Sequence, residues 1–221
     1  MQISTEKSVT KSRSKSIIRD YAEAIIIALL LALVIRTFVV QAFKIPSGSM
    51  KSTLLVGDHI LVNKFVYGIK LPYWNIELLP ISQPKRQDIV VFRYPVDPSK
   101  DFIKRVVGLP GDTIRIQDKK VFVNEQPLSE PYVVHSDSRV LPLSTSPRDN
   151  MIPVKVPANS LFVMGDNRDE SYDSRFWKFV DMSELRGKAF IIYWSWNNDG
   201  ELSLSPQESY VRWNRIGSLL H

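Results

Sequence analysis

Two separated segments of this 221-residue chain contain residue types that can form a nucleophile and its base. Residues 46–50, PSGSM, carry two serines in a turn-like setting. Residues 102–106, FIKRV, have the alternation of a strand, which places Lys104 on one face with its apolar neighbours and Arg105 on the other. Desolvation among apolar side chains lowers the pKa of a lysine. Because a neutral amine can act as general base to a serine, the two segments permit Ser/Lys chemistry, although each alone also fits an ordinary turn or strand.

A third segment, residues 164–175, is unusually dense in polar groups. Its sequence, MGDNRDESYDSR, includes four acidic residues, two arginines, two serines and one asparagine. In isolation this composition fits a solvated turn, and it also fits a polar network that holds a site in place. A calcium loop is excluded, because an arginine occupies a ligand position and the glycine needed for the turn is missing.

The remaining composition excludes several other chemistries. There is no cysteine, which removes thiol catalysis, cysteine-bound zinc, iron–sulfur clusters and disulfide scaffolds. The three histidines, His59, His135 and His221, are scattered. No nucleophile elbow, phosphate loop, dinucleotide fingerprint or HExxH motif occurs. We therefore expect no metal site and no cofactor.

The net charge of +6 does not indicate nucleic-acid binding, because of where the charges lie. Residues 1–36 hold six basic and three acidic residues, and the other 185 hold 23 basic and 20 acidic. The bulk of the chain is thus nearly balanced and lacks a basic stripe. We expect no nucleic-acid partner.

The N-terminal region predicts a membrane anchor. Residues 1–16 are polar and are expected to be a disordered tail, whereas residues 17–42 are largely apolar. The stretch Tyr21–Val40 has twenty residues, with Glu23 and Arg36 near its ends, which is enough for a helix to cross a bilayer core of about 30 Å. The alternatives are a buried helix of a soluble protein and a secretory signal peptide, but no small-x-small cleavage site follows.

Flanking charges predict the orientation of this anchor. Residues 1–19 contain five Lys/Arg and one acid. The positive-inside rule then places the N-terminus in the cytoplasm and residues 43–221 on the extracytoplasmic side.

From Phe43 onward the pattern indicates a mainly antiparallel β domain, with runs of β-branched and aromatic residues between turn signals. Turns are expected at residues 109–112 and 118–120. The proline-rich part of residues 113–158 predicts a small cap or insertion. The expected strands are Ile60–Val66, Asp88–Tyr94, Phe102–Leu109, Thr113–Gln117, Val121–Asn124, Leu161–Met164 and Ala189–Trp194.

Four segments in this order resemble the boxes of the type I signal peptidases, the Ser/Lys leader peptidases. They are residues 43–50, 57–65, 101–112 and 165–175, and the resemblance extends from Arg36 to about Tyr193. It implies the β-rich catalytic domain of that family with residues 113–158 as its cap. It also implies a membrane-anchored serine endopeptidase that removes signal peptides from exported preproteins.

The resemblance assigns roles residue by residue. Ser49 would be the nucleophile and Lys104 the general base. The Ser49 N–H and the Ser47 hydroxyl would form the oxyanion hole, and Ser171 would orient Lys104. Asp173 and Arg175 would form a supporting ion pair. Shallow pockets for small residues at positions −1 and −3 of the substrate would be lined by Ile45, Pro46, Met50, Leu54, Phe102 and Ile103.

One position departs from the family pattern. Where the family often has proline two residues after the methionine, this chain has Ser52. Because proline fixes φ, its loss is expected to loosen the turn behind the nucleophile without abolishing activity.

The predicted anchor and the family resemblance together imply where the protein is located and what it binds. Ser49 follows Phe43 by six positions, a reach of at most ~20 Å, so the nucleophile is expected close to the membrane. The implied partners are signal peptides and the lipid bilayer. The implied location is the plasma or inner membrane of a cell, or an equivalent internal membrane.

Two alternative functions remain at this stage. A membrane-anchored adaptor would need neither the serine nor the buried lysine. A self-cleaving repressor shares Ser/Lys chemistry and a related β fold, but it would need a DNA-binding module where this chain has its apolar segment.

Overall fold

The protein is described by a computed structural model that covers residues 10–70, 77–78, 82–197 and 211–220. The chain divides into two units, Met1–Val39 and Val40–His221.

The first unit is helical. The helix α1, Thr10–Val34, is followed by a π-helical turn, η1, Ile35–Val39. The disordered tail expected over residues 1–16 is therefore helical from Thr10, because residues 10–34 contain no glycine or proline to stop the helix. Apolar side chains such as Ile25, Leu29 and Leu33 are exposed along α1. In the described part of the chain, no helix combines the length and the hydropathy needed to cross a membrane.

The second unit begins with a strand where the sequence predicted the end of the anchor. The strand β1, Val40–Lys44, pairs antiparallel with β2, Asp58–Asn63, in a register that places Phe43 opposite Ile60. The predicted anchor boundary at residue 42 is thus too late. In a short apolar run, the sequence pattern does not distinguish a helix from a strand. Here residues 40–44 form a strand because they pair with β2.

The main sheet has seven strands in the order β1-β2-β13-β5-β6-β11-β12, with antiparallel neighbours. The mainly antiparallel β fold is confirmed. The expected strand 60–66 ends at Asn63, because the Asn63 side chain accepts the N–H groups of Phe65 and Val66 and a 3-10 turn follows. The other strands are β5 Ile89–Arg93, β6 Asp101–Gly108, β11 Ser160–Met164, β12 Val180–Asp181 and β13 Leu185–Ser195.

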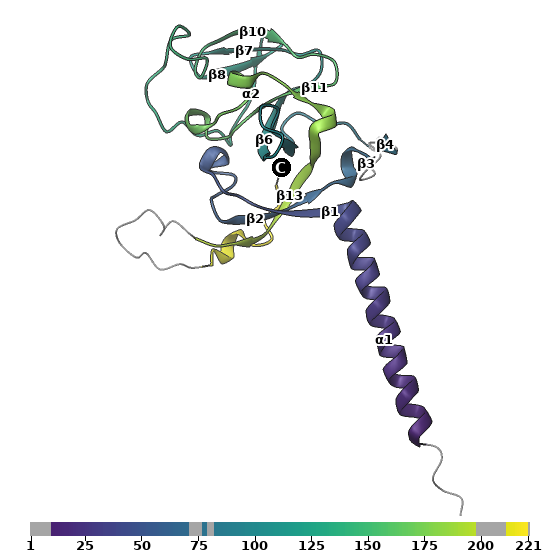
Figure 1. Cartoon of the computed structure of the whole chain (residues 1–221). Coiled ribbons are helices and arrows are strands. Elements are labelled where there is room, and N and C mark those ends of the chain that lie inside the picture. Colours follow the sequence, from purple (N-terminus) through teal and green to yellow (C-terminus); the bar gives the residue numbers. More distant parts are fainter. Residues whose placement is uncertain (1–9, 71–76, 79–81, 198–210, 221) are drawn as a thin grey trace, which may run out of the picture. The chain divides into compact units, whose positions relative to one another are not determined.

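A second, four-stranded sheet lies within residues 113–158, the range for which a small cap or insertion was predicted. Its order is β10-β7-β8-β9, and Figure 1 shows it at the end of this unit opposite β1 and β2. Asp118 and Lys119 have positive φ values of 48° and 68°, as a two-residue hairpin turn requires. The strands are β7 Thr113–Gln117, β8 Lys120–Val123, β9 Gln126–Pro127 and β10 Met151–Lys155.

The remaining described elements are short. They are β3 Ile69–Lys70, β4 Glu77–Leu78, α2 Ser174–Trp177 and the 3-10 helices η2 Gly48–Met50, η3 Phe65–Tyr67, η4 Arg168–Glu170, η5 Met182–Glu184 and η7 Trp213–Arg215.

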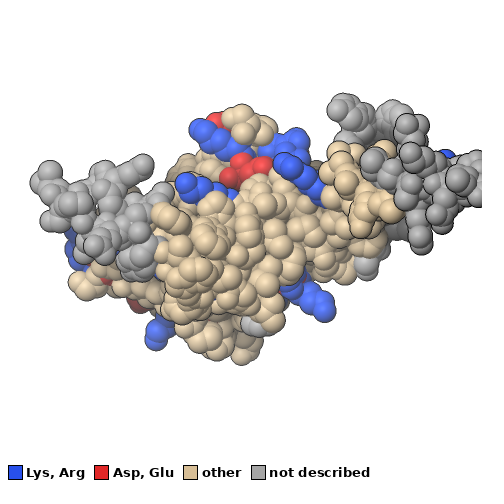
Figure 2. Space-filling view, turned by 90° about the horizontal axis from the view of Figure 1, so that it is seen from below, with Lys and Arg blue, Asp and Glu red and all other residues tan. Residues whose placement is uncertain are grey.

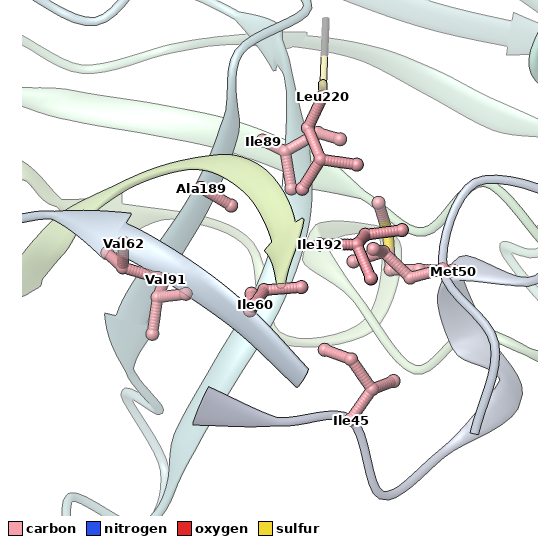
Figure 3. Packing of buried hydrophobic residues seen from close by; sticks show 10 residues of the cluster. Ile45, Met50, Ile60, Val62, Ile89, Val91, Ala189, Ile192 and Leu220 are labelled. Atoms are coloured by element: carbon pink, nitrogen blue, oxygen red, sulfur yellow. The ribbon is translucent and has the colours of Figure 1, made fainter. Parts of the chain in front are cut away.

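A hydrophobic cluster lies directly under η2. Met50 and Leu54 are fully buried in it together with residues of β2, β5 and β13. Figure 3 shows Met50 in this cluster with Ile192 and Leu220. Burying a methionine or leucine side chain contributes about 1.5–3 kcal/mol, so this packing fixes the turn that carries Ser49 to the sheet.

Candidate active site

Ser49 lies in the tight turn η2, at the end of the segment that leaves β1. Two backbone bonds close the turn: Lys51 N–H donates to Gly48 O at 2.9 Å and Leu54 N–H donates to Met50 O at 2.8 Å. Ser49 is only 9% exposed. The turn therefore holds the serine side chain at the rim of the domain core.

Lys104 reaches this serine from β6. Its Nζ donates to Ser49 Oγ at 2.7 Å and to Ile103 O at 3.0 Å. The side chain is 4% exposed, and Nζ lies 5.4 Å from the centre of the Phe102 ring. The structure thus brings together the serine and the lysine that the sequence pattern singled out, within hydrogen-bond reach.

The environment of Lys104 favours the neutral amine. Burial lowers the pKa of Lys104 from 10.5 to about 8, although the charges of Asp173 and Asp166 act in the opposite direction. Removing a charged group from water disfavours its charged form, which explains the direction. About a tenth of the amine is then neutral at pH 7, whereas a lysine with an ordinary pKa near ~10.4 has almost none.

The next residue on β6, Arg105, has a different function. It is buried and forms a two-pronged ion pair with Asp166, with Nε to Oδ1 at 2.9 Å and Nη2 to Oδ2 at 2.7 Å. Thr53 Oγ1 donates to Asp166 Oδ2 at 2.6 Å. Asp166 therefore ties β6 to the segment that follows the nucleophile turn. Sequence reasoning missed this role of Asp166 and Thr53; the only signal was the acidic density of residues 164–175.

The predicted ion pair of Asp173 and Arg175 is present and buried. Arg175 Nε and Nη2 lie 2.8 Å from Asp173 Oδ1 and Oδ2 respectively. Burial alone would raise the pKa of Asp173, but Arg175, Ser171 and the Gly165 N–H together hold it below its usual value. Asp173 therefore stays ionised, and its charge limits how far the pKa of Lys104 falls.

Ser171 is buried beside this pair but does not bond to Lys104. Its Oγ packs against Gly165, where a Cβ added to the glycine would lie only 2.3 Å from that oxygen. The Lys104 amine instead donates to Ser49 and to the Ile103 carbonyl. Ser171 Oγ is buried and has no hydrogen-bond partner among the described residues, so the expected hydrogen bond from Ser171 that would orient Lys104 is not formed in this structure.

A groove of about 380 Å³ opens beside the serine and the lysine. Pro46, Phe102 and Ile103 line it as the resemblance implied, and so does Ser47. Its full lining is Pro46, Ser47, Gly48, Ser49, Asp101, Phe102, Ile103, Lys104, Glu170 and Tyr172.

Three predicted lining residues lie elsewhere. Ile45, Met50 and Leu54 do not line the groove, and their side chains are buried in the hydrophobic cluster beneath it. An apolar side chain next to a nucleophile can face either the groove or the core, and here the core removes more apolar surface from water.

No histidine lines this groove among the described residues. His59 lies on β2, with its ring 5.9 Å from the Tyr193 ring, and His135 lies 3.6 Å from Asp169. His221 is outside the described residues. The described His, Asp and Glu side chains also form no cluster suited to a metal ion.

A buried lysine amine bonded to a serine hydroxyl, at the edge of an open groove in an antiparallel β domain, is the arrangement of a serine hydrolase. The chain matches the family model described as "Signal peptidase, peptidase S26" over residues 18–194. The chain therefore belongs to the signal peptidase S26 family, and it is a serine protease of the type I signal peptidase class.

Curated relatives support this membership. The chain is 39% identical to a signal peptidase I of Pseudomonas aeruginosa, with 91% of this chain and 81% of the relative covered. It is 36% identical to a signal peptidase I of Leptolyngbya laminosa, with 91% and 92% covered. A crystal structure of a signal peptidase I from Enterococcus faecalis is 32% identical over 48% of this chain and 97% of that chain, with a TM-score of 0.39.

Proposed function

We propose that this protein removes N-terminal signal peptides from exported preproteins, with Ser49 as nucleophile and Lys104 as general base. The observation that carries the proposal is the 2.7 Å contact between the buried Lys104 Nζ and Ser49 Oγ. Membership of the signal peptidase family and the relatives named signal peptidase I support the substrate class.

Each chemical step has a residue to perform it. Neutral Lys104 takes the Ser49 hydroxyl proton while Oγ attacks the carbonyl carbon of the scissile peptide bond. The Ser49 N–H and the Ser47 hydroxyl stabilise the resulting oxyanion. The Lys104 ammonium then protonates the leaving amine as the C–N bond breaks, which leaves an ester on Ser49. Lys104 next takes a proton from a water molecule that attacks this ester. It returns the proton to Ser49 Oγ as the ester C–O bond breaks, which releases the signal peptide and restores the serine and the neutral lysine.

The groove supports a preference for small side chains next to the scissile bond. Phe102, Ile103 and Pro46 bring apolar surface close to Ser49. Within a groove of about 380 Å³ that also accommodates the peptide backbone, we propose that positions −1 and −3 of the substrate carry small residues. No cofactor takes part in the proposed reaction.

We propose further that the apolar part of the first unit, from residue 17 to residue 39, anchors the enzyme in a membrane, with the N-terminus in the cytoplasm and the catalytic domain outside. The charge asymmetry of residues 1–19 and the exposed apolar side chains of α1 support this arrangement. Figure 2 shows a face with a broad uncharged area, and Lys and Arg side chains with some Asp and Glu lie along its edges. Protease added to intact spheroplasts should degrade the catalytic domain and spare the N-terminus, and a protected domain would contradict the topology.

Two variants of the full chain test the chemistry. Ser49→Ala and Lys104→Arg should both be folded and inactive on a preprotein with a small-x-small cleavage site, because the first lacks the nucleophile and a guanidinium stays protonated. Lys155→Met removes an exposed lysine from the cap and should retain activity. A Lys104→Arg enzyme that cleaves at the wild-type rate would refute the assignment of the base.

A further inference from the structure

The peptide bond between Gly48 and Ser49 has a special position in this site. A trans peptide is planar, and its C=O and N–H point in opposite directions. Whatever fixes the Gly48 carbonyl therefore also fixes the direction of the Ser49 N–H. That N–H is the main-chain donor proposed above for the oxyanion, so the hold on the Gly48 oxygen bears directly on catalysis.

Asn167, which lies outside the turn, forms hydrogen bonds to this peptide and to the next carbonyl. Its side-chain Nδ2 donates to Gly48 O at 3.2 Å, and its backbone N–H donates to Ser49 O at 3.1 Å. Asn167 therefore donates hydrogen bonds to the carbonyl that precedes Ser49 and to the carbonyl of Ser49 itself. Gly48 O also accepts the Lys51 N–H, but that bond lies within the turn and would move with it.

The segment that carries Asn167 cannot easily shift. A Cβ placed on Gly165 would come within 2.4 Å of Ser49 O, so the two backbones are in close contact. Asp166 is held by Arg105 and Thr53, and the side chain of Asn167 is 1% exposed. The donor on Asn167 is therefore a fixed point for the turn.

Glu170 determines which way the Asn167 amide faces. Its Oε2 accepts from the same Nδ2 at 3.0 Å, so the two amide hydrogens have one acceptor each, Gly48 O and Glu170. A flipped amide would place Oδ1 against a carbonyl and a carboxylate, which both repel it. Asn167 Oδ1 is buried and has no hydrogen-bond partner among the described residues, so its orientation follows from the two donated bonds.

We infer that Asn167 is a positioning residue that directs the Ser49 N–H at the oxyanion, and that Glu170 keeps its amide in the donating orientation. The inference rests on the proposed function, because it assigns this peptide to the oxyanion hole. The Asn167 side-chain amide forms no hydrogen bond to Ser49 Oγ or to the Lys104 amine, so the effect of this side chain passes through its bond to the Gly48–Ser49 peptide.

The decisive variant is Asn167→Ala in the full-length chain, assayed in detergent on a signal-peptide substrate. Complete loss of one oxyanion donor lowers kcat by about 10²–10³, so loosening it should lower kcat by about tenfold or more with little change in KM. Asn167→Asp places an acceptor against Gly48 O and Glu170, so it should be at least as slow. Asn150→Ala is the matched control, because Asn150 also donates Nδ2 to a main-chain carbonyl, that of Leu141 in the cap.

Inhibition by a peptide aldehyde distinguishes a positioning role from a merely structural one, because only a positioning role predicts a selective loss of aldehyde affinity. Ser49 Oγ adds to the aldehyde carbon and its proton passes to Lys104, which leaves an oxyanion in the hole without any leaving group. Asn167→Ala should weaken aldehyde inhibition by the same factor as kcat/KM, while inhibition by the matching peptide alcohol stays at the wild-type level. Glu170→Gln keeps an acceptor for the Asn167 amide and should lose less kcat and aldehyde affinity than Glu170→Ala, which should itself lose less than Asn167→Ala.

Different results overturn different claims. Wild-type kcat in a folded Asn167→Ala enzyme, or slow cleavage with unchanged aldehyde affinity, would refute the positioning role. If Asn167→Ala does not fold, exposed Glu170 provides the test, and a Glu170→Ala enzyme with wild-type kcat and aldehyde affinity would refute it. Failure of the wild-type chain to cleave any signal-peptide substrate would instead refute the proposed function.

Discussion

Replacing Lys104 with methionine should make the protein inactive and, at neutral pH, slightly more stable. Burial lowers the pKa of Lys104 from 10.5 to about 8, a shift of 2.5. At 1.36 kcal/mol per pKa unit, the charged lysine destabilises the folded state by about 3 kcal/mol at pH 7. The methionine variant avoids this penalty but loses two hydrogen bonds, to Ser49 and Ile103, worth about 1 kcal/mol each. We expect a net gain of about 1 kcal/mol at pH 7.

The pH dependence distinguishes this explanation from simple improvement of packing. Between pH 8 and 10.5 the unfolded wild-type chain binds a proton at Lys104 that the folded chain does not, so wild-type stability rises with pH across this window. The methionine variant has no such pH-dependent contribution to its stability. Its advantage of about 1 kcal/mol at pH 7 should become a disadvantage of about 2 kcal/mol above pH 10.5, when only the lost hydrogen bonds remain.

The assay is urea unfolding of the detergent-solubilised full chain at half-unit pH steps from 7 to 11. Lys155→Met, at an exposed position, controls for the loss of a lysine as such and should run parallel to wild type. Wild-type and Lys104→Met stabilities that differ by the same amount at every pH would refute the desolvation of Lys104.

Three further outcomes are expected. The backbone at Ser52 has φ 83°, which proline cannot adopt. In urea melts, Ser52→Pro should therefore lower the free energy of unfolding by more than about 2 kcal/mol, whereas Ser52→Gly should stay within about 1 kcal/mol of wild type. Equal stabilities of the two variants would contradict this expectation. Changing Ala to Leu at position −1 of a peptide substrate should lower kcat/KM by more than about tenfold, since overpacking costs about 1–3 kcal/mol, and equal cleavage would exclude a shallow pocket. Replacing His59, His135 and His221 together by Gln should retain most activity in the same peptide assay, and an inactive variant would favour a histidine base.

The β fold and the burial of Lys104 follow from local patterns in the sequence, whereas the role of Ser49 was implied by the family resemblance. Alternation along residues 102–106 places Lys104 among apolar neighbours, and the structure finds it buried. The turn at Asp118 and Lys119 follows from polar residues between two alternating runs. These features depend on residues adjacent in the chain, which is why the sequence alone predicts them.

Features that depend on long-range packing were not predictable. Asp166 meets Arg105 and Thr53 across 61 and 113 residues of sequence, and no local signal marks such a pairing. The turn after the nucleophile was expected to loosen without proline. Ser52 has a positive φ and donates its hydroxyl to Tyr132 O at 2.8 Å, so this turn is bonded to the cap region by a contact that no local signal marked.

The most direct test of the Ser49–Lys104 mechanism is kcat/KM for a signal-peptide substrate as a function of pH. Because the neutral Lys104 amine is the proposed base and burial lowers its pKa to about 8, the rate should rise about tenfold per pH unit below 8 and level off above it. A rate that levels off above an inflection near ~6.5, the ordinary value for histidine, or one that does not change between pH 7 and 9, would contradict the mechanism.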